Sequence, residues 1–388
     1  MNHSERNAPN SERVRKISLS SQVESLIREE LVLWIGFCAV AVFLTIGIPW
    51  VVSPSGPVAA AGVFGILFVL MLALSFRVVH HAECLAGKLG EPYGTLILTL
   101  SVIMIEVAMI CALMLTGKND PTLARDTMFS VLMIVLNGIL GVTLLVGGYR
   151  HRQQEFNLEG ARSYLAVIMT LSFLCLILPR FVDSAPGGAA SPLVYGFLAI
   201  ASVVLYGIFL FLQSTRHRIF FVQPGGDEEE SVAHGHDSTH SSFYHAAFLI
   251  LTLLPIVLLS KKVALLLDYG LVILKAPVGL AGFAVALLVL SAEALAAFKA
   301  AYKNSLQRTV NIVLGSSLST IGLTVPAVLL ISKLTGKPIE LGLEPTEIVL
   351  LVATFFAAGT IFGGKRTNML AGVIHLILFA AYVVLIFD

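Results

Sequence analysis

Two carboxylates lie in the middle of otherwise apolar stretches of this chain. Glu106 sits within LSVIMIEVAMICALML (100–115) and Glu293 within a similar run, whereas the other Asp and Glu residues fall in expected loops, such as Asp268, or near the ends of apolar runs. A carboxylate at the centre of a membrane helix costs about 3 kcal/mol on insertion scales. Two carboxylates placed at this cost indicate that they serve a function. A buried carboxylate can hold either a proton or a cation. The alternative is a protonated Glu that only hydrogen-bonds neighbouring helices.

The composition indicates that these stretches lie in a lipid bilayer. The chain has 388 residues, of which 57% are hydrophobic and 13% are charged, and its mean hydropathy is +0.89. These values are far from those of a soluble domain and predict an integral membrane protein. The net charge of +1 gives no indication of a nucleic-acid partner. The four cysteines lack CxxC spacing and are expected to fill core space, and the polar first 30 residues contain no signal-peptide pattern.

Apolar stretches of about 20 residues, the length that crosses a bilayer as a helix, recur along the chain. We therefore predict an all-α integral membrane protein of about eleven transmembrane helices, with no room for a soluble catalytic domain. The expected spans are 31–52, 57–79, 92–115, 126–148, 161–181, 192–213, 243–260, 277–299, 306–331, 344–362 and 367–387.

One long polar break, PGGDEEESVAHGHDSTHSS (224–242), divides these spans into six and five. Without the first span the halves have five spans each, and Glu106 and Glu293 both lie in the second span of their half, 14 residues past Pro92 and 16 past Pro277. An odd number of spans per half inverts the second copy in the membrane, as in secondary transporters whose site lies where inverted repeats meet. The expected divisions are a cytoplasmic segment 1–30, an extra transmembrane helix 31–56, a first repeat 57–213, a cytoplasmic linker 214–242 and a second repeat 243–388.

Small and oxygen-bearing side chains accompany both carboxylates. Helical spacing from Glu293 reaches a stripe of small residues that lets another helix approach closely, and spacing from Glu106 reaches two threonines. The next span of the second half contains LGSSLSTIGLTVP (314–326), and its counterpart LNGILG (136–141) contains one amide. These residues either line a cation site or simply pack helices. They are Gly282, Ala286, Ala297 and Ala300; Thr95 and Thr99; Gly315, Ser316, Ser317, Ser319, Thr320 and Pro326; and Asn137.

Three segments resemble a known family: HAECLAGKLGEPYGTLILTLSVIMIEV (81–107), AEALAAFKAAYKNSLQRTVNIVLGSSLSTIGLTVP (292–326) and TNMLAGVIHLILFAAYVV (367–384). The chain is similar to the cation/proton exchanger branch of the calcium/cation antiporter superfamily, most of all to its bacterial ChaA type. The resemblance implies exchange of cytoplasmic Ca²⁺, Na⁺ or K⁺ for external protons, without a cofactor. It also implies a shared site on Glu106 and Glu293, joined by Gly315, Ser316 and Ser317, with Ser319 nearby.

Several histidines and acidic residues are either regulatory or simply part of solvated segments. The linker residues could sense cytoplasmic cations or pH, or could form a plain solvated connection. His80 and His81, near Glu83 and Glu91, could line a vestibule or a hydrated interface, and His375 is expected to be a satisfied core residue more often than a ligand. The candidate regulatory residues are Asp227, Glu228, Glu229, Glu230, His234 and His236.

The distribution of Lys and Arg favours a cytoplasmic N-terminus and an external C-terminus in the inner membrane. The expected partners are inorganic cations, protons and the lipid bilayer, and the sequence indicates no oligomeric state. A membrane metalloenzyme would need clustered His side chains, and no His adjoins the carboxylates inside the apolar spans. A channel without proton coupling, or a cation-sensing membrane scaffold, is the alternative to an antiporter.

Overall fold

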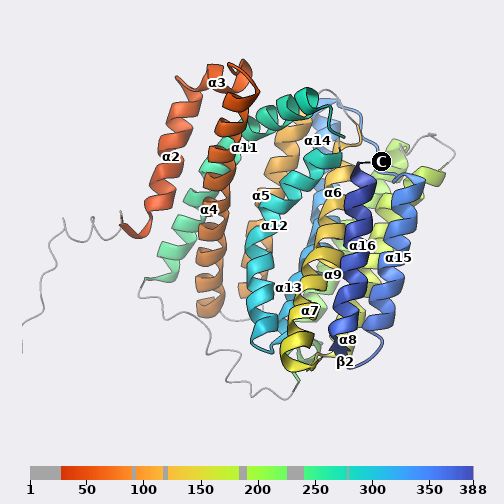
Figure 1. Ribbon diagram of the computed structural model, residues 1–388. Helices are drawn as coiled ribbons and strands as arrows, with labels where there is room; N and C mark the ends of the chain where they lie inside the picture. The colour runs from red at the N-terminus through yellow and green to blue at the C-terminus, as the bar shows by residue number, and fades with distance from the viewer. Residues whose placement is uncertain are drawn as a thin grey trace, which may run out of the picture.

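The computed structural model describes residues 28–89, 93–116, 121–182, 190–224, 240–277 and 279–387. Backbone groups in a bilayer cannot bond water, and a helix satisfies them within one segment, so apolar stretches of this length form helices. The protein is mostly helical (Figure 1). Its elements are α2 (Leu31–Leu44), α3 (Ile48–Val52), α4 (Pro57–Leu89), α5 (Tyr93–Thr116), α6 (Leu123–Met133), η1 (Ile134–Ile139), α7 (Leu140–His151), β1 (Gln153–Glu155), α8 (Leu158–Ser172), η2 (Phe173–Ile177), η3 (Leu178–Phe181), α9 (Pro192–Ser214), η4 (Arg218–Phe221), α11 (Ser242–Leu274), α12 (Gly279–Tyr302), α13 (Leu306–Ser319), η5 (Thr320–Thr324), α14 (Val325–Thr335), α15 (Pro345–Ile361), β2 (Arg366–Asn368) and α16 (Met369–Ile386).

Each predicted span lies on one apolar helix or on a run of consecutive helical segments. Within the described residues, eight helices are long and apolar enough to cross a membrane. Three further apolar helices are shorter: α2, the Leu100–Leu115 part of α5, and α15. The protein is therefore a helical membrane protein, whereas the count of eleven spans stays a prediction.

The helices α4 and α11 are longer than expected, at 33 residues each. The sequence predicts that the span in α11 ends at residue 260 and that Asp268 lies in a loop. The assignment of Asp268 is wrong, because α11 continues to Leu274. The charged Lys261 and Lys262 lower the local hydropathy, but they do not break a helix. Buried Val263 and Leu266 carry the apolar face of α11 onward beyond them.

Two of the central helices are interrupted by π-helical turns at matching places. In the first half η1 separates α6 from α7, and in the second half η5 separates α13 from α14. A π-helical turn shifts the side-chain register and is frequent at functional sites. We therefore expect residues of η1 and η5 to lie near the two carboxylates.

Two apolar cores flank the helices that carry the carboxylates. One core gathers buried residues of α2, α4 and α11, and the other gathers those of α6 to α9 and α13 to α16. The helices α5 and α12 contribute to both cores and run through the middle of the molecule (Figure 1). Glu106 and Glu293 are therefore held between two packed bodies.

A short pair of strands ties the two halves together at one end of the helices. β1 pairs antiparallel with β2, with Gln154 opposite Thr367. β1 follows α7 and β2 precedes α16, whose backbones approach closely at Gly148 and Met369. This contact fixes the end of the helix that contains η1.

Candidate functional site

Glu106 is buried in α5, with only 2% of its surface exposed. Its two carboxylate oxygens accept hydrogen bonds from different threonines of the opposite half. The hydroxyl of Thr320 donates to Oε2 at 2.9 Å, and the hydroxyl of Thr324 donates to Oε1 at 3.1 Å. Both threonines belong to η5. The π-helical turn thus presents two hydroxyls, four residues apart, to one carboxylate.

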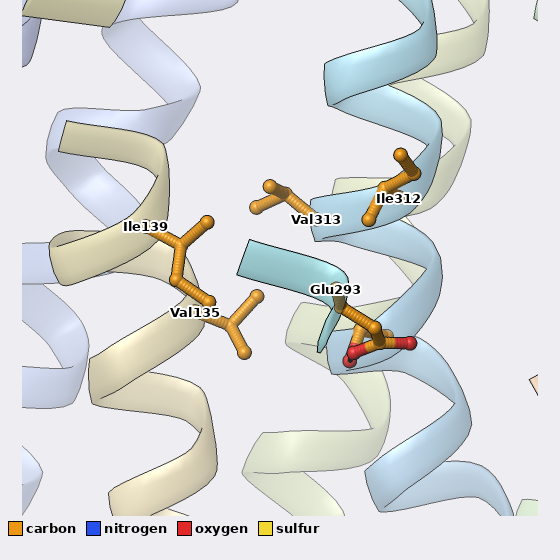
Figure 2. A pocket seen from close by; sticks show the side chains of 6 residues that line it. Val135, Ile139, Glu293, Ile312 and Val313 are labelled. Atoms are coloured by element: carbon orange, nitrogen blue, oxygen red, sulfur yellow. Dashed lines mark hydrogen bonds between the residues drawn. The ribbon is translucent and has the colours of Figure 1, made fainter. Parts of the chain in front are cut away.

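Glu293 of α12 has a different environment. Its Oε2 accepts a hydrogen bond of 2.6 Å from the hydroxyl of Ser316 in α13, the neighbouring helix of the same half. The carboxylate lies at a narrow pocket whose walls include Val135 and Ile139 from η1 and Val313 from α13 (Figure 2). Unlike Glu106, this side chain faces apolar groups of the opposite half and is only partly buried.

The two carboxylates belong to one region, because α5 packs on α12 and both carboxylates accept hydrogen bonds from the α13–η5 segment. The small-residue stripe predicted on α12 is confirmed as a packing surface. Gly282 lies so close to α6 that a Cβ there would be 2.9 Å from the Thr127 backbone, and Ala286 and Ala297 are buried. Close packing of α12 on α6 brings Glu293 next to η1.

The structure brings only part of the predicted residue set to the carboxylates. Ser316 contacts Glu293, as described. Ser317 and Ser319 are buried, but their hydroxyls donate to backbone carbonyls of their own helix, at Val313 and Ser316. Gly315 faces Tyr164 of α8. Their assignment to the cation site stays a prediction.

Asn137 lies in η1 and takes part in a separate buried network. Its amide nitrogen donates to the hydroxyl of Thr354 at 2.8 Å, and its oxygen lies 3.0 Å from Nδ1 of His375. His375 is thus a core histidine hydrogen-bonded through Nδ1, but its buried Nε2 has no hydrogen-bond partner among the described residues, so the expectation of a satisfied core histidine is met only in part. Within the described part of the chain, the Asn137 side chain makes no hydrogen bond to Glu106 or Glu293.

Some predicted residues lie outside the described part of the structure. The side chains of Thr95 and Thr99 are among them, and so is the linker 225–239. That linker contains all the candidate regulatory residues, namely Asp227, Glu228, Glu229, Glu230, His234 and His236.

Sequence reasoning did not assign Thr320 or Thr324 to Glu106. The available signal was their spacing of four residues, which places both on one face of a helix. It was weak because hydroxyl side chains are common in membrane helices, where they often bond the preceding turn.

Comparisons with known proteins agree with this architecture. The chain matches the family described as sodium/calcium exchanger protein over residues 59–215 and 244–387. The chain belongs to this exchanger family. The gap between the two matched segments coincides with the polar linker. The predicted family resemblance is confirmed, and this exchanger is a membrane transporter rather than an enzyme.

Individual relatives of the exchanger cover most of its length. It is 42% identical over 319 residues to the sodium-potassium/proton antiporter ChaA of Escherichia coli strain K12, which covers 82% of this chain and 86% of that protein. The solved structure of native YfkE matches with a TM-score of 0.69 at 17% identity, covering 92% of this chain and 99% of YfkE. The crystal structure of the H⁺/Ca²⁺ exchanger CAX matches with a TM-score of 0.66 at 15% identity, covering 94% of this chain and 89% of CAX. At such identities the two structures support the fold alone.

Proposed function

We propose that this exchanger exports cytoplasmic Na⁺, K⁺ or Ca²⁺ in return for external protons, across a bacterial inner membrane, with its N-terminus in the cytoplasm and its C-terminus outside. The observation that carries the proposal is the pair of carboxylates Glu106 and Glu293. They lie on helices that hold the same place in the two halves, and each accepts hydrogen bonds from hydroxyls of the α13–η5 segment. The name of the 42% identical relative supports monovalent cations among the substrates.

Competition between a proton and a cation supplies the coupling. Burial disfavours a carboxylate anion, so an empty pair of Glu side chains retains protons, whereas a bound cation favours the ionised form. The hydroxyls of Thr320, Thr324 and Ser316 can donate to a carboxylate and can also offer oxygen lone pairs to a hard cation. A carboxylate that gives up its proton to bind a cation couples the two movements.

An inverted repeat would let the same site open to either side in turn. The two halves have matching elements: α4 and α11 have 33 residues each, α5 and α12 have 24 each, and a π-helical turn interrupts the following helix of both. The contact of Glu106 with η5 and the position of Glu293 beside η1 cross from one half to the other. We infer that rocking of one half against the other moves the site between the two faces.

The proposal is tested by cation-driven proton movement in everted vesicles, where Na⁺, K⁺ and Ca²⁺ are each added to membranes that hold a preformed pH gradient. The wild-type protein should dissipate the gradient with at least one of these ions. Glu106→Gln and Glu293→Gln remove the exchangeable charge and should each lower the rate by about a hundredfold or more, in the range for loss of a group that takes part in proton transfer.

The matched control is Glu159→Gln, which changes an exposed Glu in the first turn of α8. It should keep the wild-type rate. Wild-type exchange in both Glu106→Gln and Glu293→Gln would show that the two carboxylates are structural and would overturn the proposal.

A further inference from the structure

A second buried polar cluster lies where α2, α4 and α11 meet, outside the candidate transport site. Its centre is Glu30, directly before α2 and only 1% exposed. One carboxylate oxygen accepts hydrogen bonds of 2.7 Å from Nη2 of Arg77 and from the hydroxyl of Tyr244. The other oxygen lies 3.3 Å from Nε2 of His81. One carboxylate therefore ties the start of α2 to both α4 and α11.

The cluster continues into a pair of facing histidines. Nδ1 of His81 in α4 lies 3.1 Å from Nδ1 of His245 in α11, and both side chains are buried, with exposed fractions of 0% and 2%. Two ring nitrogens at this distance need one proton between them. The pair is thus a hydrogen bond between α4 and α11 whose state depends on how many protons it holds.

The contacts of Glu30 fix where those protons lie. Burial alone would raise the pKa of Glu30, but the hydrogen bonds from His81, Arg77 and Tyr244 outweigh it and lower the pKa to about 2. Glu30 is therefore ionised at neutral pH and accepts, so Nε2 of His81 carries a proton. In the neutral pair Nδ1 of His81 then accepts from Nδ1–H of His245, which leaves Nε2 of His245 as a buried acceptor without a hydrogen-bond partner among the residues that the structure describes.

This arrangement has room for one more proton. A proton that arrives at Nε2 of His245 lets the shared proton pass from Nδ1 of His245 to Nδ1 of His81. His81 then becomes an imidazolium that donates to Glu30 on one side and to His245 on the other. A further proton would set two N–H groups against each other at 3.1 Å, so the pair takes up a single proton while it stays intact.

The neighbouring charges come from the same three elements. Burial disfavours a positive charge on His245, and the charges of His81, Lys88, His240 and His80 oppose it further, so the added proton rests on His81 beside Glu30. Glu29 lies 2.7 Å from Nε2 of His240, and Lys88 donates to the His240 carbonyl oxygen. The negative charges of Glu29 and Glu30 favour the first added proton.

We propose that the His81–His245 pair is a second proton-binding site, which takes one proton from the cytoplasm and slows exchange when it is occupied. Charge-assisted hydrogen bonds are shorter and roughly twice as strong as neutral ones. The added proton therefore ties α2, α4 and α11 together more firmly. This step rests on the proposed function, because α4 and α11 are the first helices of the two halves that must move against each other, and the cytoplasmic location follows from the proposed orientation.

The test is the pH profile of exchange in everted vesicles, whose cytoplasmic face is outside, between about pH 6 and pH 8.5, the interval in which imidazole changes charge. At a cation concentration high enough to suppress proton competition at Glu106 and Glu293, wild-type exchange should still fall with acidification along a one-proton curve. His81→Gln and His245→Gln keep a hydrogen-bonding amide but cannot become cations. Each should keep an alkaline rate near that of the wild type and lose most of the acid inhibition. His217→Gln changes a histidine stacked on Phe220, outside the cluster, and should keep the wild-type profile.

Glu30→Gln supplies a second, independent variant. Loss of the negative charge weakens proton binding by the pair, so the midpoint of acid inhibition should move to lower pH by about one unit, which corresponds to about 1.4 kcal/mol. Variants that exchange more slowly at every pH but keep the wild-type midpoint would show that the cluster only supports the fold, and would overturn the proposal.

A measurement without transport separates this proposal from the proposed function. In detergent-solubilised protein with ¹⁵N-labelled histidine, the ring nitrogens of His81 and His245 should titrate together, with uptake of one proton. Independent titration of both rings to the imidazolium would overturn the proton-binding pair even where exchange is normal. Absence of exchange in the wild type would contradict the proposed function and leave this titration as the test of the pair.

Discussion

The two carboxylates differ in the hydroxyls that surround them. Glu106 accepts a hydrogen bond on each oxygen, from Thr320 and Thr324, whereas Glu293 accepts one from Ser316 and faces Val135 and Ile139. Donated hydrogen bonds favour a carboxylate anion, and apolar surroundings favour the neutral acid. At the scale of single residues, Glu106 is therefore better prepared to meet a cation, and its hydroxyl partners should affect cation affinity.

Thr320→Val tests this directly, because it keeps the shape of the side chain and removes the hydroxyl. A hydrogen bond to a charged group contributes about 1.5 to 3 kcal/mol, so the cation concentration for half-maximal exchange should rise by roughly tenfold or more. The control is Thr252→Val in α11, a buried threonine whose hydroxyl donates to the carbonyl of Phe248 in its own helix. An equal affinity loss in both variants would contradict a specific role for Thr320.

Sequence reasoning found the two Glu residues but only part of their surroundings. A carboxylate stands out in an apolar stretch because its burial is costly, whereas a threonine there is ordinary. Asn137 was predicted at the site from its position in the first half, yet it bonds Thr354 and His375. A π-helical turn changes which side chains face a neighbour, and helical spacing from the sequence does not include that change.

At the scale of elements, the approach of α12 to α6 positions Glu293. Gly282→Ala would put a Cβ 2.9 Å from the backbone of Thr127, and a backbone cannot yield as a flexible side chain can. We expect a loss of about 1 to 3 kcal/mol in stability, typical of overpacking, and a lower Tm in detergent.

Gly270→Ala in α11 is the matched control, because a Cβ at Gly270 meets open space. Ala is favoured over Gly within a helix by up to about 1 kcal/mol, so its Tm should be unchanged or higher. A Tm for Gly282→Ala equal to that of Gly270→Ala would mean that α12 does not depend on this close approach.

Helix existence was predictable from the sequence, but helix length was less so. The apolar runs fix where helices lie, because a run of about 20 apolar residues satisfies its own backbone in lipid as a helix. The ends of α4 and α11 extend past charged residues such as Lys88 and Lys261, since charges at a membrane surface are compatible with a helix. His81 lies in the extension of α4, whereas His245 lies within the predicted span 243–260, so the spans alone did not show that the two meet at Glu30.

At the scale of the whole molecule, the proposed inverted repeat requires opposite orientations for the two halves and an external C-terminus. Alkaline phosphatase, which is active only outside the cytoplasm, should be active when fused after Phe387. The same enzyme fused after Gln223, at the start of the linker, should be inactive. Activity at Gln223 together with inactivity at the C-terminus would reverse the orientation and contradict the cytoplasmic location of the His81–His245 pair.

The central claim is that a proton and a cation compete for Glu106 and Glu293. The most direct measurement is proton release by purified protein in weakly buffered detergent when Na⁺, K⁺ or Ca²⁺ is added. We predict that the transported cation releases protons from the wild type, and that Glu106→Gln combined with Glu293→Gln abolishes the release. Cation binding to the wild type without proton release, or undiminished release from the double variant, would contradict the account.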